Sequence, residues 1–295
     1  MTKEKLLIIN ADDFGLHEEI NWGIYDAHHK GVLTSTTLIP CGTATLQASK
    51  LAKESPNLGI GVHLTLVGGL QPILPLSDIP SLVTSQGVFR NSHLSFIRDW
   101  SIGKIDKIEI ENEWRAQIEK ILDLDLPISH IDSHQHLHVL PGLQDLVLKL
   151  ATQYRIPAIR IPKEPYSIVE TNSSTSPSRI LSRTGLSFCA HQAKKKWNSL
   201  SSPDHFFGML TGGNMTLKNW EKLIPLIPVG VSEVMTHPGR NNRILSQPFS
   251  WGYHWQEELA ALQSKEIAQW IKKNSIKLIN YRNLKSKNPI AGTSC

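Results

Sequence analysis

Short apolar runs alternate with more polar, helical stretches along most of the chain. The runs lie at residues 6–10, 33–40, 60–66, 130–134, 158–161, 231–236 and 276–280. Runs that are nearly continuous in apolar residues are typical of parallel strands that are covered on both faces. The alternation therefore predicts an α/β domain with a parallel sheet.

Helical periodicity is clearest in three stretches. In the first two, apolar side chains recur every three or four residues and share one helix face; they are Ile110, Trp114, Ile118 and Ile121, and then Leu143, Leu146, Val147 and Leu150. The third stretch predicts one long helix over residues 255–273.

Two segments interrupt this rhythm. Residues 67–105 carry several glycines and prolines with little periodicity, and residues 162–215 are rich in Ser, Thr and Pro. Long connections of this kind in compact domains are usually lids or binding loops. Because strand-like runs continue after each segment, we interpret both as insertions over one end of a barrel and not as linkers.

Composition narrows the class of protein. The chain has 295 residues, of which 40% are hydrophobic and 19% are charged, and this excludes a disordered or fibrous protein. The net charge of +5 is dispersed apart from one basic run at residues 194–196, so we expect no nucleic-acid partner. Cys41, Cys189 and Cys295 are too scattered for a disulfide framework or a zinc ribbon. We find neither a secretory leader nor an apolar run long enough to cross a bilayer, and therefore expect a cytoplasmic protein without a membrane span.

Polar residues at the ends of the apolar runs are the first sign of chemistry. Asp12 and Asp13 follow the first run, and ligands of parallel α/β folds collect at the carboxyl ends of strands. A turn or a helix N-cap explains two aspartates there equally well. His63 lies inside the third run, where a lone histidine is more often a hydrogen-bonded core residue than a ligand. Neither feature alone indicates a site.

The fourth run carries a denser pattern. Side chains alternate between the two faces of a strand, so Asp132, His134, His136 and His138 are expected to share one face while the strand lasts. Burying four titratable groups together is costly unless they have partners. A solvated edge strand would avoid that cost, but the flanking helices favour a covered strand. Metal ligation or catalysis is the better explanation, and His237 adds a histidine at the end of the sixth run.

Taken together, the aspartates and histidines at the ends of these runs predict a metal site. Aspartate and histidine together suit Zn²⁺, Mn²⁺, Co²⁺ or Mg²⁺. Three protein ligands with open positions are typical of a catalytic metal and not of a structural one. A second carboxylate can deprotonate water, and a further histidine can protonate a leaving group. The residues thus indicate metal-assisted hydrolysis.

Segments along nearly the whole chain resemble one known family. They are Asn-Ala-Asp-Asp-Phe-Gly at 10–15, Thr-Ser-Thr-Thr at 34–37, Gly-Val-His-Leu-Thr-Leu at 61–66, His-Ile-Asp-Ser-His-Gln-His-Leu-His at 130–138, Arg-Ile-Pro at 160–162, Phe-Phe-Gly at 206–208 and His-Pro-Gly at 237–239. The family is that of the YdjC-type carbohydrate deacetylases, which includes chitooligosaccharide deacetylase and the hopanoid-associated deacetylase HpnK. The Asp-Asp-Phe-Gly and Asp-Ser-His-x-His elements are specific together, although neither is specific alone.

This resemblance implies a fold, a cofactor and a reaction. The fold is a single-domain α/β structure, a distorted TIM-like (β/α) barrel over residues 1–284 with long insertions over its C-terminal face, followed by a polar tail at 285–295. The cofactor is one divalent metal ion, Mg²⁺ or Zn²⁺, with Co²⁺ or Mn²⁺ also suitable. The reaction is hydrolysis of the N-acetyl group of an acetylated amino sugar or oligosaccharide, with release of acetate. The resemblance also allows a homodimer.

The same resemblance implies roles for single residues. Asp13, His63 and His134 would be the metal ligands, Asp12 the base and His237 the acid. The residues that would orient these groups or contact the substrate are Arg160, which would orient Asp12, and Asp132, His136 and His138.

The same residues are also compatible with other functions. A barrel metallohydrolase that acts on another amide or on a phosphoester would use similar residues, although a two-metal phosphoesterase needs more bridging carboxylates than the motifs supply. A non-catalytic sugar-binding barrel would need neither the Asp12–Asp13 pair nor His237. Exposed aromatic residues near the insertions would stack on a sugar ring, unless they belong to the core; they are Trp251, Tyr253, Phe206 and Phe207.

Overall fold

The computed structural model describes residues 4–165 and 177–284. Its strands are β1 (Lys5–Phe14), β2 (Ser35–Leu38), β3 (Gly59–Leu64), β4 (Ile131–Ser133), β5 (His205–Phe207), β6 (Gly230–Thr236) and β7 (Ile276–Leu278). Its α-helices are α1 (Glu18–His29), α2 (Thr45–Lys53), α3 (His93–Ser101), α4 (Lys107–Asp123), α5 (Gln144–Gln153), α6 (Pro177–Lys196), α7 (Leu217–Leu223), α8 (Asn242–Leu245), α9 (Trp255–Leu262) and α10 (Lys265–Lys273). Two short 3₁₀ segments matter below, η2 (His134–Val139) and η5 (Tyr281–Asn283).

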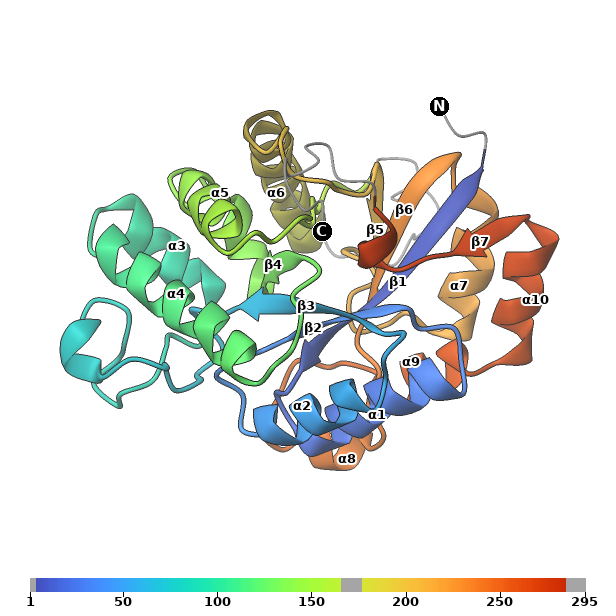
Figure 1. Cartoon of the computed structure of the whole chain (residues 1–295), viewed down its shortest axis with the longest axis horizontal. Coiled ribbons are helices and arrows are strands. Elements are labelled where there is room, and N and C mark those ends of the chain that lie inside the picture. The colour runs from blue at the N-terminus through green and yellow to red at the C-terminus, as the bar shows by residue number, and fades with distance from the viewer. Residues whose placement is uncertain (1–3, 166–176, 285–295) are drawn as a thin grey trace, which may run out of the picture.

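The strands form one parallel sheet with β1 at its centre. The order is β4-β3-β2-β1-β6-β5, and β7 pairs with β1 outside this path. On one flank β1 pairs with β6 along most of its length, while the other flank is divided between β7 at its start and β2 at its end. Parallel strands twist relative to one another, and the sheet curls into a half-barrel (Figure 1). This confirms the predicted α/β class and the distorted barrel.

An irregular segment links the two edges of the curled sheet. The amide of Ile131 donates to the carbonyl of Ala158 at 3.0 Å, and the amide of Ile159 donates to the carbonyl of Ser201 at 2.9 Å. The predicted strand at 158–161 is therefore present only as isolated bridges. This segment matters because it carries Arg160 to the inside of the barrel, where its side chain is fully buried.

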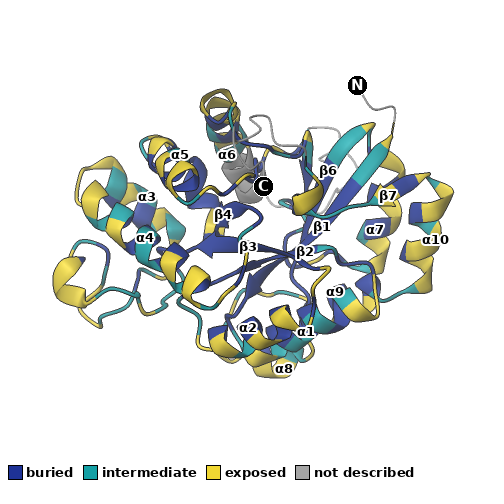
Figure 2. Ribbon diagram, in the orientation of Figure 1, coloured by how far each residue is buried: buried dark blue, intermediate teal, exposed yellow. Residues whose placement is uncertain are grey.

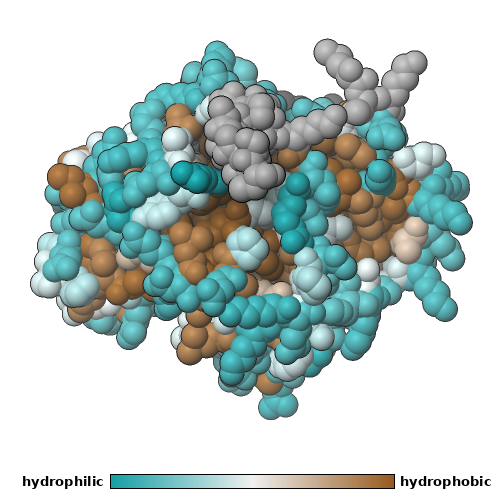
Figure 3. Space-filling model, viewed as in Figure 1, coloured by the Kyte–Doolittle hydropathy of each residue, from teal (hydrophilic) through white to brown (hydrophobic). Residues whose placement is uncertain are grey.

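Helices lie outside the sheet on the left, lower and right sides of Figure 1. The strands are buried over most of their length, while the helices expose their outward faces (Figure 2). Figure 3 shows hydrophilic side chains over the outer helices and apolar side chains gathered toward the middle of this face. The predicted apolar stripe of α4 is confirmed, because its members are all fully buried; they are Ile110, Trp114, Ile118 and Ile121.

The inside of the barrel is unusually polar. On β1, Leu7 and Ile9 pack in the main core with the helices, whereas Ile8 packs with Tyr281 in a separate inner cluster. Because side chains alternate, the inner face of β1 continues from Ile8 to Asn10 and Asp12. Barrel interiors are normally filled by branched apolar residues, so this inner row is a departure that marks the site.

Four sequence predictions need correction or a limit. The helix predicted over 255–273 is two helices, because Ser264 caps α10 by accepting a hydrogen bond from the amide of Ile267 at 3.2 Å. The segment 67–105 contains helix α3, and the segment 162–215 contains α6 and the unpredicted strand β5. The predicted tail at 285–295 lies outside the described residues. Of the helices in the described part of the chain, none has both the length and the apolar character that a membrane span requires.

Candidate active site

Asp12 and Asp13 reach the same cavity because strand β1 is irregular near its end. Neighbouring side chains on a regular strand point to opposite faces. Asp13 adopts a left-handed backbone with φ of 69°, and the pairing of β1 with β2 shifts register between Ala11 and Phe14. Aspartate tolerates this conformation better than most residues. Both carboxylates are buried and line one cavity.

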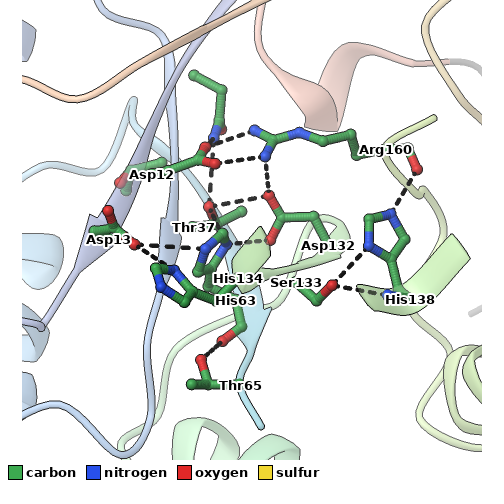
Figure 4. Close-up of polar contacts among 12 residues, drawn as sticks. Asp12, Asp13, Thr37, His63, Thr65, Asp132, Ser133, His134, His138 and Arg160 are labelled. Atoms are coloured by element: carbon green, nitrogen blue, oxygen red, sulfur yellow. Dashed lines mark hydrogen bonds and ion pairs between the residues drawn. The ribbon is translucent and has the colours of Figure 1, made fainter. Parts of the chain in front are cut away.

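His63 and Asp132 are registered neighbours on β3 and β4, and their side chains interact directly (Figure 4). Nδ1 of His63 lies 2.7 Å from Oδ1 of Asp132, and Nε2 lies 3.6 Å from Oδ1 of Asp13. A carboxylate on one ring nitrogen fixes the tautomer and leaves the other nitrogen as a metal donor. Burial by itself lowers the pKa of His63, but Asp132 and the other carboxylates outweigh burial and raise the pKa to about 9.

Strand β4 is shorter than the sequence pattern predicts. It ends at Ser133, and Gln135 and His136 follow with left-handed φ angles of 55° and 56°. Each such residue costs about 1–2 kcal/mol, and strain of this kind collects at functional sites. The prediction that four side chains share one strand face is therefore wrong, because alternation stops where the strand stops; these residues are Asp132, His134, His136 and His138.

The turn sends two of these histidines into the cavity. Nδ1 of His134 lies 3.1 Å from Oδ1 of Asp13. His136 is buried with its ring edge toward Phe206, and burial lowers the pKa of His136 well below its ordinary value. Nδ1 of His136 has no partner among the described residues. A buried, uncharged ring with a free nitrogen suits contact with a polar group of a ligand.

His138 turns away from the cavity. Its Nδ1 lies 2.7 Å from Oγ of Ser133, and its Nε2 lies 3.2 Å from the backbone carbonyl of Arg160. The ring stacks on Trp197 with 8° between the planes, and burial lowers the pKa of His138 to about 4. His138 therefore holds the main chain at Arg160 and lies away from the metal-ligand candidates.

Arg160 pairs with Asp12 in a bidentate arrangement (Figure 4). Nη1 donates to Oδ2 of Asp12 and Nη2 donates to Oδ1, both at 2.7 Å. Nη1 also lies 2.5 Å from Oδ2 of Asp132. Burial by itself raises the pKa of Asp12, but the charge and hydrogen bonds of Arg160 outweigh burial and lower it. Asp12 is thus held ionised in a fixed orientation.

His237 lies beside Asp12 at the mouth of the barrel. Ala11 of β1 pairs with Thr236 of β6, so the residues that follow them are neighbours. The amide of His237 donates to Oε2 of Glu258 at 2.6 Å, which fixes its main chain. Its Nδ1 is buried without a partner among the described residues.

The cavity that these residues share has a volume of about 590 Å³. Both predicted insertions contribute to its wall, with Leu94 and Ile97 from α3 and Leu186 and Cys189 from α6. This confirms that the insertions lie over the carboxyl end of the sheet, where the strands deliver their polar residues.

The residues present fit a divalent metal ion. Asp13, His63 and His134 each offer a ligand atom, and these atoms lie within 4.8 Å of one another. One carboxylate and two imidazoles are a donor set that Zn²⁺ and related ions accept. Three buried carboxylates surround the single guanidinium of Arg160, so the buried acids outnumber the arginine. A divalent cation would offset this excess of negative charge.

A second group of acidic and histidine residues does not offer a second metal site. Asp12, His63 and Asp132 also lie within 4.8 Å of one another. Both carboxylates are already paired with the guanidinium of Arg160, so an ion there would meet a fixed positive charge. The geometry favours one ion, and it disfavours a two-metal phosphoesterase.

Sequence reasoning missed three buried residues that hold the site. Glu233 contacts Arg160, Tyr281 contacts Glu233, and Glu258 accepts from the amide of His237. Glu233 gave a usable signal, because it is an acid inside the apolar run at 231–236. Tyr281 and Glu258 gave none, because only the tertiary fold brings them to their partners.

The aromatic residues proposed to stack on a sugar fall into two classes. Phe206 and Phe207 are 1% and 2% exposed, so they belong to the core and the expectation that they are exposed is wrong. Tyr253 lines the cavity and packs against His237, and Trp251 packs against His134. Of the four, Tyr253 lines the cavity, and Trp251 packs beside it.

Comparisons with known proteins show similarity over nearly the whole chain. The model of the YdjC-like protein family matches residues 6–273. A carbohydrate deacetylase of Brevibacillus brevis is 34% identical over 94% of this chain and 99% of its own, and one of Geobacillus stearothermophilus is 32% identical over 93% and 96%. A crystal structure from Enterococcus faecalis, provisionally described as a cellobiose-phosphate cleavage protein, superposes with a TM-score of 0.76 at 31% identity, covering 94% of this chain and 98% of that one.

The arrangement predicts different defects for the two adjacent aspartates. Asp13→Asn should weaken binding of a divalent ion, because it removes a charged ligand atom. Asp12→Asn should keep the ion but lower turnover by ~10²–10⁴, because the sequence predicts that Asp12 is the general base. Calorimetric titration with Co²⁺ and steady-state kinetics separate the two effects.

Asp26→Asn is the control, because Asp26 is also a buried aspartate but pairs with Lys30 and Arg240 outside the site. Equal loss of Co²⁺ binding in both site variants would contradict the prediction that Asp13 binds the ion and Asp12 does not.

Proposed function

This chain belongs to the YdjC-like family, and on that premise we propose that it is a metal-dependent N-deacetylase of acetylated amino sugars or oligosaccharides. One observation carries the proposal: Asp13, His63 and His134 converge in a cavity whose wall also contains Asp12 and His237. The names of the relatives support a carbohydrate substrate.

The metal-ligand candidates define what the cofactor would contribute. A divalent ion held by Asp13, His63 and His134 would polarise the amide carbonyl and make an adjacent water more acidic. Asp132 would keep Nε2 of His63 available by occupying its Nδ1. Mg²⁺ and Zn²⁺ are both proposed, and the homodimer and the cytoplasmic location stay predictions from the sequence.

Asp12 is the proposed general base. Arg160 keeps its carboxylate ionised, so it starts the reaction able to accept a proton from water. The same interaction makes Asp12 a weak base, and an acidified water compensates for that weakness. Arg160 also prevents the carboxylate from rotating toward the metal-ligand candidates, which keeps Asp12 and Asp13 distinct.

His237 is the proposed general acid. Its main chain is fixed by Glu258 on α9, and its ring packs on Tyr253. The ring lines the cavity within the same wall as Asp12. From this position it would donate a proton to the departing amine of the sugar.

A panel assay tests the proposed activity. The purified protein, stripped with EDTA and reloaded with Mg²⁺, Zn²⁺, Co²⁺ or Mn²⁺, is offered N-acetylglucosamine and chitooligosaccharides of increasing length. We expect acetate release that disappears with EDTA and returns with at least one ion. Sugar binding without acetate release under every condition would instead identify a non-catalytic sugar-binding barrel.

The role of His237 has a specific kinetic signature. His237→Ala should keep Co²⁺ and sugar binding but lower kcat by ~10²–10⁴, because the proton donor is lost. The alkaline limb of the pH–rate profile should also disappear, since that limb reports loss of the acid's proton. The main-chain bond to Glu258 survives the substitution, so the loop stays anchored. His254→Ala, at an exposed histidine nearby, is the control. An intact alkaline limb with near-normal turnover would place the donor elsewhere.

A further inference from the structure

The guanidinium of Arg160 is held by carboxylates on three of its sides. Its outer Nη1–Nη2 edge engages Asp12, with both distances at 2.7 Å. Nη1 also reaches Asp132 at 2.5 Å. On the other side, Nε and Nη2 lie 2.9 and 2.8 Å from Oε1 of Glu233. All of these groups are buried.

Glu233 fixes a degree of freedom that the other two acids leave open. A bidentate contact on the outer edge defines where the guanidinium lies, and a contact on the Nε side defines the rotation of its plane. The rotation of this plane determines whether Nη1 can contact Asp12 and Asp132 at the same time. The side chain that sets the plane is therefore Glu233, which lies outside the cavity wall.

Glu233 is itself held by Tyr281 of η5. The phenol donates to Oε2 of Glu233 at 2.5 Å. The ring of Tyr281 stacks on His130, with centroids 3.6 Å apart and 4° between the planes. His130 in turn packs closely on Gly61 of β3, since a Cβ at Gly61 would lie 2.5 Å from the His130 ring. A continuous chain of contacts thus links Arg160, through Glu233, Tyr281 and His130, to strand β3.

Packing alone gives no reason for these polar residues. Inward positions of such barrels are ordinarily apolar, and a buried ion pair is often no more stable than apolar residues of similar volume. Glu233 and Tyr281 are both fully buried or nearly so. Their presence is explained if the orientation of Arg160 matters to the chemistry.

We infer that Glu233 and Tyr281 are positioning residues for the reaction, acting through Arg160 on both Asp12 and the Asp132–His63 pair. The inference rests on the proposed function for its kinetic part. When the guanidinium rotates, Asp12 loses its bidentate partner, and Asp132 keeps Thr37 but loses the contact with Arg160 that helps to hold it against Nδ1 of His63. A substitution at Glu233 or Tyr281 is therefore expected to disturb both Asp12, the proposed base, and His63, a proposed metal ligand.

Conservative variants test the inference in the full-length protein. Tyr281→Phe removes one hydroxyl, and Glu233→Gln keeps the shape of the side chain but removes its charge. We expect each to lower kcat about tenfold or more and to weaken Co²⁺ binding about tenfold, as for other residues that orient metal ligands. KM should change by less than about threefold, because neither residue lines the cavity. The double variant should lose little more than Glu233→Gln, since Tyr281 acts through Glu233.

Matched controls separate positioning from stability. Glu113→Gln alters another buried glutamate, which accepts from the amides of Ile73 and Leu74 and does not contact Arg160. Tyr154→Phe removes a surface hydroxyl that is bonded to Glu119. Both controls should keep kcat and Co²⁺ affinity, and melting temperatures confirm that every variant is folded at the assay temperature.

The outcomes distinguish the two proposals. A lower melting temperature with unchanged kcat and unchanged Co²⁺ affinity in Tyr281→Phe and Glu233→Gln would overturn the inference and make both residues merely structural. If Glu233→Gln does not fold, Tyr281→Phe decides alone. If the unaltered protein releases no acetate from any sugar, the proposed function fails, and the Co²⁺ titration still decides whether Glu233 and Tyr281 position His63.

Discussion

The contact between Arg160 and the buried carboxylates is the constraint on which the rest of the site depends. Asp12, Asp132 and Glu233 come from three different strands and all meet one guanidinium. Burying carboxylates without such a partner would cost several kcal/mol for each ion. The irregular segment between β4 and β5 brings the long side chain of Arg160 into the barrel. The fold therefore places the positive charge of Arg160 at the centre of the site, with the three acids around it.

This arrangement divides the acids by function. Asp12 is paired with the guanidinium, while Asp13, one residue later, is turned by its left-handed backbone toward His63 and His134. Burial by itself raises the pKa of Asp13, but His134, together with His63 and His237, outweighs burial and lowers it. One carboxylate is thus held by the guanidinium, and the other faces the two histidines. The difference arises from backbone geometry and not from residue type.

Much of the fold follows from the sequence, because buried parallel strands are continuous apolar runs and their boundaries are turns. The site motifs are equally local, since ligands at strand ends are polar residues that interrupt these runs. The errors lie where structure depends on contacts distant in sequence. The histidine alternation after Ser133 looks like a strand, and nothing in the pattern indicates the left-handed turn at Gln135 and His136. Strand β5 is too short to give a pattern, and Tyr281 reaches Glu233 only through tertiary packing.

We propose that a single divalent cation on the side of Asp13 completes the acidic cluster. Anomalous diffraction from crystals grown with Zn²⁺ tests it most directly. We expect one strong peak about 2.0–2.3 Å from a carboxylate oxygen of Asp13, Nε2 of His63 and a ring nitrogen of His134, with Arg160 still paired with Asp12. A peak between Asp12 and Asp132 with Arg160 displaced, or no peak at these residues at saturating Zn²⁺, would contradict it.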